Sequence, residues 1–304
     1  MKILLLGKGG QVGWELQRSL SVLGEVVALD RHGDKDLCGD LTNLRGLAET
    51  VRRVQPGIIV NAAAYTAVDQ AERESDLAHA INAVAPGVLA QEAMRIGARL
   101  VHYSTDYVFD GSGDAPWCEI DTPAPLNVYG RSKLEGEQAI HRSGCSHLIF
   151  RTSWVYAARG GNFAKTMLRL AREREELKVI DDQWGAPTGA DLLADVTAHV
   201  LRTVAGHGVG AMPRPELQGL YHVAASGSTT WFEYANHVLE QSLIAQPSIK
   251  IAAKRITAIS SSAYPTSAQR PRNSRLNTAK LQTDFGLSLP SWQTGVTRML
   301  REIL

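Results

Sequence analysis

The run KILLLGKGGQVG at residues 2–13 decides the fold of this chain. Its apolar start is typical of a buried strand, and Gly7, Gly10 and Gly13 follow in a G-x-x-G-x-x-G spacing that opens a helix. Glycines allow a tight turn and let a pyrophosphate approach main-chain N–H groups at the helix amino terminus. The spacing also fits a β-α turn that binds nothing. Its position directly between a strand and a helix favours a dinucleotide-binding turn.

Short apolar runs alternate with amphipathic segments through the first half, which is typical of β-α units around a parallel sheet. The expected strands are 2–6, 26–29, 58–60, 100–104 and 147–150, and the expected helices are 12–23, 44–54, 77–96 and 128–140. Right-handed crossovers place such helices on both faces of the sheet. We therefore predict an α/β fold with a doubly wound, Rossmann-type parallel sheet at 1–153. A smaller C-terminal substrate lobe is expected at 154–304, with some segments returning to the sheet.

The composition is that of a soluble globular protein, with 304 residues, 44% of them hydrophobic, and a formal net charge of +1. Nucleic-acid binding is disfavoured because it usually requires a basic excess or stripe. The three cysteines are widely spaced and form no C-x-x-C pair, so neither a disulfide framework nor a zinc site is indicated. No apolar run reaches membrane-spanning length. We expect a cytoplasmic protein with no nucleic-acid partner and no membrane partner.

Two residues at the end of the second predicted strand bear on the coenzyme. Asp30 lies about 20 residues beyond the glycine turn, where a carboxylate accepts hydrogen bonds from the adenosine ribose. Its neighbour Arg31 is suited to the 2′-phosphate of NADP. We therefore expect both NADH and NADPH to serve. The alanines at 62–64 fit either close passage of the main chain along the coenzyme or simple tight packing.

A second group of residues suits the reduction of a ketone. Thr105 and Asp106 follow the strand expected at 100–104, at the sheet edge where ligands of open α/β folds bind. Tyr129 and Lys133 lie four residues apart in a predicted helix, so they share one face. A phenol can protonate an alkoxide if its pKa falls from about 10 toward neutrality, which a nearby ammonium promotes. Thr105 would donate a hydrogen bond to the carbonyl oxygen.

With these residues the chain resembles the extended short-chain dehydrogenase/reductases, and within them the dTDP-4-dehydrorhamnose reductases. The resemblance covers almost the whole chain and is carried by GKGGQVGWEL (7–16), VNAAAYTAVD (60–69), YSTDYVF (103–109), PLNVYG (125–130), RTSWVY (151–156), DQWGAPT (182–188), RP (270–271) and NSRL (273–276). It implies NAD(P)H-dependent reduction at C4 of dTDP-4-dehydro-β-L-rhamnose. The product, dTDP-L-rhamnose, feeds cell-surface polysaccharide such as the O antigen of lipopolysaccharide.

The resemblance also implies a role for each matched position. Tyr129 and Lys133 are the catalytic pair, and Thr105 completes the triad in place of the commoner serine. Thr105, Asp106 and Trp154 would face the sugar. Together with Gly7 and Arg31, which follow from the turn and strand above, the expected coenzyme contacts are Gly10, Gln11, Val12, Asp30, Asp40, Leu41, Ala63, Ala64, Tyr65, Tyr129 and Lys133.

Two further residues are open to two interpretations. Trp154 is either core filler or a flat contact for the deoxysugar. Arg270, next to Pro271, is either part of a solvated charge cluster or a clamp for the nucleotide diphosphate, which guanidinium groups suit. We expect His102 to be structural, because it lies within a predicted strand.

The chain departs from its relatives at two places. Some relatives dimerise through Mg²⁺ held by acidic side chains. Glu15 and Asp191 match two of those positions, but a carboxylate is missing near 291–292. The sequence therefore assigns no metal site, disfavours Mg²⁺ as a cofactor and leaves a homodimer open. Tyr65 stands where relatives often carry His, and we expect its main chain and ring edge to face the coenzyme.

Two other functions remain as alternatives. A nucleotide-sugar dehydratase or epimerase would share the fold, but similar dehydratases follow the strand-end threonine with Asp-Glu, whereas Tyr107 follows Asp106 here. A non-catalytic regulatory subunit that senses NAD(P)H usually lacks the tyrosine or the lysine, and this chain keeps both.

Overall fold

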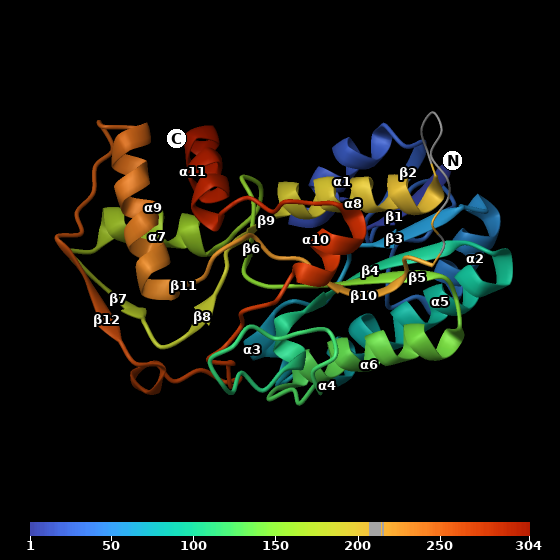
Figure 1. Ribbon diagram of the computed structural model, residues 1–304, viewed down its shortest axis with the longest axis horizontal. Helices are drawn as coiled ribbons and strands as arrows, with labels where there is room; N and C mark the ends of the chain where they lie inside the picture. The colour runs from blue at the N-terminus through green and yellow to red at the C-terminus, as the bar shows by residue number, and fades with distance from the viewer. Residues whose placement is uncertain (207–213, 215) are drawn as a thin grey trace.

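The computed structural model describes residues 1–206, 214 and 216–304 (Figure 1). The larger part of the molecule is built on six parallel strands in the order β10-β5-β4-β3-β1-β2. These strands are β1 (Lys2–Leu6), β2 (Glu25–Leu29), β3 (Ile58–Asn61), β4 (Arg99–Thr105), β5 (His147–Thr152) and β10 (Gly219–His222). The predicted α/β fold with a Rossmann-type parallel sheet is confirmed.

Helices cover both faces of this sheet (Figure 1). One face carries α1 (Gln11–Ser21), α8 (Ala190–Ala205) and α10 (Ala279–Phe285), and the other carries α2 (Leu44–Val54), α5 (Ala85–Ile96) and α6 (Val128–Ser143). In β1, Ile3 and Leu5 pack into the core under α1 and α8, whereas Leu4 and Leu6 pack under α2 and α5. A strand covered on both faces must be apolar throughout, which is why this one reads as a continuous hydrophobic run.

The strand order reverses direction at β1, because β2 pairs with one side of it and β3 with the other. Ligands of open α/β sheets bind at the carboxyl ends of the strands where such a reversal occurs. Thr105 ends β4, the neighbour of β3, at this same edge. The topology therefore brings the glycine turn and the predicted catalytic threonine to one side of the molecule.

The helix expected at 77–96 is interrupted. It consists of α4 (Ser75–His79), a π-helical turn η1 (Ala80–Val84) and α5. Pro86 has no N–H, so the Asn82 carbonyl has no partner in an α-helical ladder. The Ala85 N–H instead bonds the carbonyl of Ala80, five residues back. The expected helix is therefore present over 75–96, with one π-helical turn that the sequence did not predict.

The smaller part is formed by segments after β5 and has its own core, in which Tyr234 and Trp292 are buried. Its elements are β6 (Val155–Tyr156), α7 (Phe163–Glu173), β7 (Glu176–Ile180), β8 (Trp184–Gly185), β9 (Thr188–Gly189), β11 (Thr229–Thr230), α9 (Trp231–Ala245), β12 (Arg255–Ile259), η3 (Ser261–Ala263) and α11 (Trp292–Ile303). The remaining short helices, α3 (Val68–Ala71) and η2 (Asp106–Val108), lie in the first half. Three segments of the second half, α8, β10 and α10, belong to the larger part.

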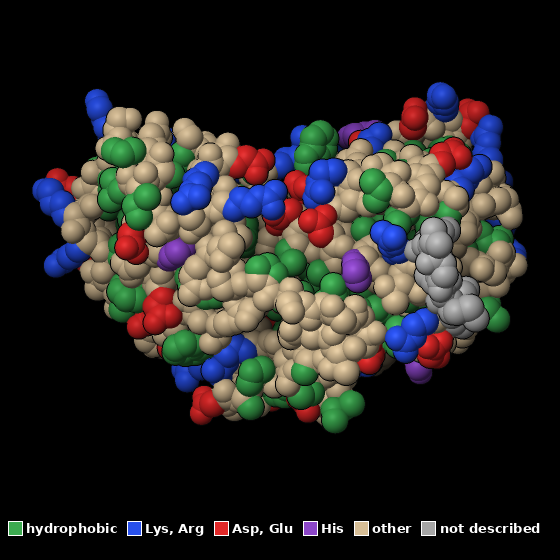
Figure 2. All heavy atoms as spheres, turned by 45° about the horizontal axis from the view of Figure 1, so that its top comes forward, with side chains coloured by type: hydrophobic (Ala, Val, Ile, Leu, Met, Phe, Trp, Pro, Cys, Tyr) green, Lys and Arg blue, Asp and Glu red, His purple; other side chains and the backbone are tan. Residues whose placement is uncertain are grey.

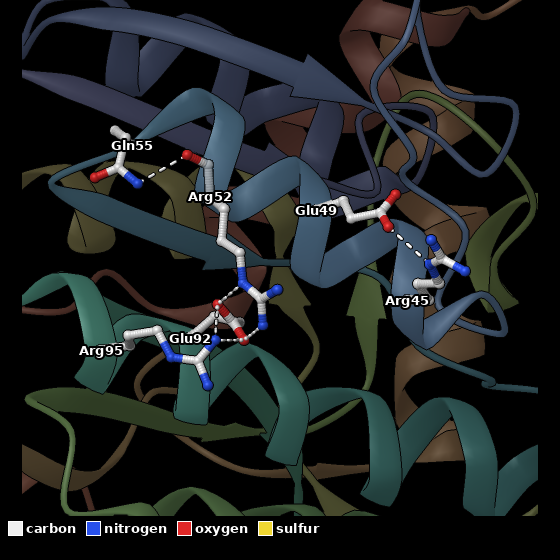
Figure 3. A network of polar contacts seen from close by, with 6 residues as sticks. All are labelled: Arg45, Glu49, Arg52, Gln55, Glu92 and Arg95. Carbon is white, nitrogen blue, oxygen red and sulfur yellow. Dashed lines mark hydrogen bonds and ion pairs between the residues drawn. The ribbon is translucent and has the colours of Figure 1, made fainter.

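A network of charged side chains links α2 and α5 by hydrogen bonds and ion pairs (Figure 3). Glu92 on α5 is only 4% exposed, and its carboxylate accepts hydrogen bonds of 2.6 and 2.8 Å from Arg52 on α2. Arg95 donates to the same carboxylate at 3.1 Å. By contrast, the ion pair of Arg45 and Glu49 is exposed. A buried carboxylate needs such partners, so this network stabilises one specific packing of the two helices.

The surface is indented where the two parts of the molecule meet (Figure 2). On this face Lys and Arg side chains are spread over both parts with Asp and Glu among them. Within the described ranges, no helix is long and apolar enough to cross a bilayer.

Candidate active site

The glycine turn after β1 is shaped by close contacts of main chain. Gly7 has a φ of +88°, and a Cβ there would lie 2.8 Å from the Ala63 nitrogen in the loop after β3. A Cβ on Gly13 would lie 2.0 Å from the Gly7 carbonyl oxygen. Gly10 precedes α1, and no described side chain caps the first turn, which also lacks an acidic residue. The N–H groups there are free for an anion, so the turn fits a pyrophosphate.

The side chain of Gln11 points away from this turn toward the second half of the chain. Its Nε2 donates a hydrogen bond of 2.6 Å to the Gly161 carbonyl. Val12 packs against the core beneath α1. At these two positions the main-chain N–H groups are therefore the groups suited to hold a coenzyme.

Asp30 and Arg31 lie directly after β2, as predicted. The Asp30 carboxylate accepts the His32 N–H at 2.9 Å and lies 3.9 Å from the Lys8 ammonium, which belongs to the glycine turn. Arg31 is exposed beside it. The structure thus joins the acidic residue to the glycine turn, and contact of the exposed Arg31 with a 2′-phosphate stays a prediction.

Asp40 and Leu41 form a compact turn ahead of α2. The Asp40 carboxylate accepts hydrogen bonds from the N–H and the hydroxyl of Thr42, at 2.9 and 2.8 Å. Leu41 is 5% exposed and belongs to the core under α2. Because the Leu41 side chain packs in the core, the expected contact of Asp40 and Leu41 with the adenine stays a prediction.

The loop after β3 carries Ala63, Ala64 and Tyr65, all partly buried. The Tyr65 hydroxyl donates to Glu74 at 2.7 Å, so its ring end is already engaged. Its main-chain N–H and carbonyl both pair with the amide of Asn82. Glu74 and Asn82 thus hold the loop through Tyr65. The two alanines place small side chains beside Gly7.

Thr105 and Tyr129 meet at the carboxyl end of β4. The buried Thr105 side chain lies beside the Tyr129 hydroxyl, and its Oγ1 donates a hydrogen bond of 3.1 Å to Asp106 Oδ1. Burial raises the pKa of Tyr129 to about 12, and the Thr105 hydrogen bond opposes that rise. The pKa of Tyr129 is therefore raised in this structure, whereas a fall was predicted, because desolvation disfavours the phenolate. A positive charge must approach the phenol to reverse it.

Asp106 carries an unsatisfied oxygen into this region. It is 2% exposed, and its Oδ2 has no hydrogen-bond partner among the residues that the structure describes. Burial raises the pKa of Asp106 to about 7, against hydrogen bonds from Ser274 and Thr105. A buried oxygen without a partner calls for an explanation, and a polar group of a bound molecule would supply one.

Lys133 is buried one helical turn after Tyr129, with 1% of its surface exposed. Its Nζ donates a 2.6 Å hydrogen bond to the Tyr103 carbonyl and lies 3.1 Å from His102 Nε2. Burial lowers the pKa of Lys133 to about 8. It also lowers the pKa of His102 well below its ordinary range, helped by the lysine charge. His102 thus orients the lysine, which agrees with the structural role expected for it.

Trp154 is packed between two other groups. Its ring stacks on that of Trp231 with centroids 3.6 Å apart, and a Cβ on Gly185 would lie 2.5 Å from the indole. Since Trp231 covers one face, Gly185 lies against the other. Trp154 also has a φ of +48°, an unusual conformation for a bulky residue. The expected flat contact with a sugar is therefore not available in this arrangement, and only the ring edge is left for a ligand.

Arg270 is held against the first half of the chain. Its guanidinium donates to both oxygens of Asp69, at 2.6 and 3.2 Å, and to the Ala268 carbonyl at 3.3 Å. The interpretation as a freely solvated charge is thus excluded for this residue. Its suitability as a diphosphate clamp stays a prediction.

The acidic positions discussed for Mg²⁺ are each neutralised by an arginine. Glu15 lies 3.6 Å from Arg18, and Asp191 lies 3.2 Å from Arg298. Among the described residues, no three His, Cys, Asp or Glu side chains are grouped so that they could hold a metal ion.

Sequence reasoning missed two buried polar residues around the site, Asn82 and Ser274. Asn82 binds the Tyr65 main chain, and Ser274 binds Asp106. A signal existed for the first, because one amide interrupts the otherwise apolar run AINAV just before a proline. Ser274 lies in the NSRL run (273–276) that carries the family resemblance, but its contact with Asp106 arises only through the fold.

Comparison with known proteins agrees with this geometry. The family described as "RmlD substrate binding domain" matches residues 1–304. A dTDP-4-dehydrorhamnose reductase of Escherichia coli K12 is 57% identical over 303 residues, covering 100% of this chain and 98% of that protein. One from Burkholderia thailandensis is 47% identical over 100% of this chain and 99% of that protein.

Solved structures give the same result. The crystal structure of dTDP-4-dehydrorhamnose reductase from Bacillus anthracis in complex with NADP is 35% identical and superposes with a TM-score of 0.86, covering 99% of each chain. That of a Clostridium acetobutylicum ortholog is 33% identical with a TM-score of 0.88, covering 100% of this chain and 99% of the other. The chain therefore belongs to the RmlD substrate binding domain family.

Proposed function

We propose that this chain is an NAD(P)H-dependent reductase that converts dTDP-4-dehydro-β-L-rhamnose to dTDP-L-rhamnose by reducing the C4 keto group. Relatives that share 57% and 47% of the sequence bear the name of this enzyme, and one similar structure was solved with NADP. The observation that carries the proposal is the placement of the buried Thr105 and Tyr129 side chains beside each other at the sheet edge that also holds the glycine turn. Lys133 lies one helical turn away.

The coenzyme would be held by the first half of the chain. The N–H groups of Gly10, Gln11 and Val12 at the start of α1 suit its pyrophosphate, since no described side chain caps that turn. The Asp30 carboxylate suits the adenosine ribose, and Arg31 suits the 2′-phosphate of NADPH. When bound, the reduced nicotinamide supplies a hydride to C4 of the sugar.

The proton comes from this chain's own residues. As the carbonyl electron pair moves onto oxygen, the Tyr129 hydroxyl gives its proton to that oxygen, and the Thr105 hydroxyl orients it by a hydrogen bond. Burial holds the Tyr129 pKa at about 12, so its phenolate must be stabilised. The Lys133 ammonium provides a charge for this purpose, and each pKa unit corresponds to about 1.4 kcal/mol.

Residues 154–304 would mainly bind the sugar nucleotide. Trp154 offers its ring edge, and Arg270 lies near enough to Tyr107 to share a hydrogen bond with it. A guanidinium in that position suits a diphosphate. From the first half, Asp106 after β4 adds its unpartnered Oδ2. We infer that these three residues bind the substrate, Trp154 and Arg270 from the second half and Asp106 from the end of β4, while other residues of the first half bind the coenzyme.

The dehydratase alternative is disfavoured by Tyr107. Its ring packs edge-on against that of Tyr129, with centroids 5.7 Å apart, where a dehydratase would place a glutamate. The acid needed for water loss is thus replaced by a phenol whose pKa is raised by burial.

The test is oxidation of NADPH and NADH in the presence of dTDP-4-dehydro-6-deoxy sugars, with and without the epimerase that produces the L configuration. Coenzyme oxidation that requires the epimerase supports the proposal. Coenzyme binding without oxidation of any such sugar would instead indicate a regulatory protein.

Three further properties follow from this assignment and stay predictions. An enzyme acting on dTDP-sugars is expected in the cytoplasm, where nucleotide sugars are made, with no nucleic-acid partner. A homodimer remains open, and light scattering with and without a chelator tests both the dimer and its independence of Mg²⁺.

A further inference from the structure

Thr152 carries a buried hydroxyl at the carboxyl end of β5. It is the last residue of that strand and is 7% exposed. Its Oγ1 has no hydrogen-bond partner among the residues that the structure describes. The hydroxyls of Thr105 and Ser153, by contrast, each donate a hydrogen bond. A valine would fill nearly the same volume in a strand without burying a polar atom, so this hydroxyl calls for an explanation.

The direction of this hydroxyl follows from the pairing of two strands. β4 and β5 run parallel and side by side (Figure 1), and Thr152 is paired in register with Thr105. Side chains alternate between the two faces along a strand. Two residues earlier, the paired Tyr103 and Phe150 have ring centroids 5.9 Å apart in the core under α1 and α8. Thr152 therefore lies beside Thr105 on the sheet face that α1 covers, where the glycine turn enters that helix.

A second unpartnered polar atom lies at the same edge of the sheet. Asp106 directly follows Thr105, and its Oδ2 also lacks a hydrogen-bond partner within the described part of the chain. The ends of the neighbouring strands β4 and β5 thus hold two buried polar atoms that a bound molecule can satisfy. The proposed function gives Asp106 to the sugar, which leaves the Thr152 hydroxyl to be assigned.

The order of the strands assigns this hydroxyl to the coenzyme. The coenzyme would start at Asp30 after β2, cross the glycine turn after β1 and the β3 loop, and reach the end of β4, because these strands are neighbours. Each step covers about 4.8 Å. The nicotinamide ring must lie beside Thr105, since its hydride goes to the carbon whose oxygen Tyr129 protonates. The carboxamide is attached next to the hydride-bearing ring carbon, and the next strand in this direction is β5.

We propose that the Thr152 hydroxyl binds the carboxamide of the nicotinamide ring. This inference rests on the proposed function, because the position of the ring comes from it. A carboxamide has two N–H donors, and Thr152 Oγ1 accepts a hydrogen bond from one of them. The sugar nucleotide instead meets Trp154 and Arg270, which approach from the second half of the chain.

The experiment compares Thr152→Val with the parent protein. Thermal unfolding without coenzyme measures stability. Quenching of tryptophan fluorescence measures the dissociation constants of NADPH and of its reduced 3-acetylpyridine analogue, in which a methyl group replaces the carboxamide nitrogen. Thr229→Val is the matched control, because Thr229 is also a strand residue, 1% exposed, whose Oγ1 donates a 2.9 Å hydrogen bond to Glu233 in α9.

We expect Thr152→Val to unfold at the temperature of the parent or above it, because the change removes an unsatisfied polar atom from the interior. NADPH should bind roughly 3- to 10-fold more weakly, the range for one hydrogen bond between neutral groups. The parent should bind the analogue more weakly than NADPH by a similar factor, whereas Thr152→Val should bind both coenzymes alike. Thr152→Ser keeps the hydroxyl and should still distinguish them. Thr229→Val should unfold at a lower temperature and keep the NADPH affinity of the parent.

Several results would overturn the proposal. Unfolding of Thr152→Val below the temperature of the parent would mean that the hydroxyl has a partner inside the protein. Unchanged NADPH affinity, or a valine variant that still distinguishes the two coenzymes, would exclude the carboxamide as the partner. A rise in KM for the keto sugar alone would assign the hydroxyl to the substrate. A parent protein that binds NADPH but reduces no keto sugar would contradict the proposed function, while the two titrations would still test Thr152.

Discussion

The Lys133 ammonium donates a hydrogen bond of 2.6 Å to the main-chain carbonyl of Tyr103. The lysine is therefore anchored by β4, the strand that ends in Thr105, although it belongs to α6. His102 flanks the same ammonium at 3.1 Å and is itself 3.2 Å from Asn61 at the end of β3. Lys133 thus holds beside the site the positive charge that the Tyr129 phenolate requires. Burial lowers the pKa of this lysine.

This arrangement predicts a pH dependence of coenzyme binding. Burial lowers the pKa of Lys133 to about 8, so the ammonium is charged below that pH and neutral above it. A neutral amine binds ribose hydroxyls less well, and NADPH affinity should therefore fall as the pH rises through about 8. Titrations across this range should show the change in the parent and not in Lys133→Met. The same slope in both proteins would assign the pH dependence to another group.

Tyr129→Phe should keep coenzyme affinity and lower turnover about 10²- to 10⁴-fold, the range for loss of a positioned general acid. The phenyl ring preserves the packing against Tyr107, so the unfolding temperature is expected to change little. Steady-state kinetics with the keto sugar and NADPH titration measure the two effects. Turnover near that of the parent would remove Tyr129 from its assigned role.

Arg31→Ala should raise KM for NADPH and leave KM for NADH nearly unchanged. Asp30 repels a 2′-phosphate, and the exposed guanidinium beside it partly neutralises that repulsion. The ratio of kcat/KM for the two coenzymes is the measurement. An equal effect on both coenzymes would show that Arg31 does not reach the phosphate.

Arg270 and Asp69 provide a matched pair of substitutions. If the guanidinium grips the nucleotide diphosphate, Arg270→Ala should raise KM for the sugar nucleotide roughly 10- to 100-fold, as expected for a charged hydrogen bond of about 1.5–3 kcal/mol. Asp69→Asn keeps the cation and should leave that KM unchanged or lower it. Neither change should alter NADPH affinity. Equal increases in KM would instead mean that the ion pair serves only to hold the loop.

Glu92 and Glu49 test the network of Figure 3. Glu92→Gln removes a charge that two arginines bind in a buried site, and should destabilise the fold by roughly 1–3 kcal/mol. Glu49→Gln, in the exposed pair, should change stability little. Arg52 holds the pKa of Glu92 below its ordinary value. The stabilisation should therefore be complete above pH of about 4.3, the unfolded value, and disappear as pH falls through the lower folded pKa. Denaturant unfolding of both variants at several pH values measures the difference.

Local sequence determined the first half of the fold. The β1 run, the glycine turn and the start of α1 follow from apolar runs, glycine spacing and helix periodicity, which act within a few residues. The expected helix at 44–54 matches α2 as observed. Tyr129 and Lys133 were recognisable for the same reason, since a spacing of four residues places two side chains on one helical face. The helix expected at 77–96 is present, but the π-helical turn within it follows from no local pattern of the sequence.

Tertiary structure alone decided the partners of the site residues. β10 pairs with β5, and β12 pairs with β7, across long stretches of chain that carry no signal of their pairing. The indole of Trp154 stacks on Trp231, so its flat faces are covered. Arg270 forms an ion pair with Asp69, and Lys133 donates a hydrogen bond to the Tyr103 carbonyl. Periodicity specifies which face a residue occupies, but not which distant side chain meets it there. The pKa values follow the same rule, because burial and hydrogen bonding between distant residues exist only once the chain has folded.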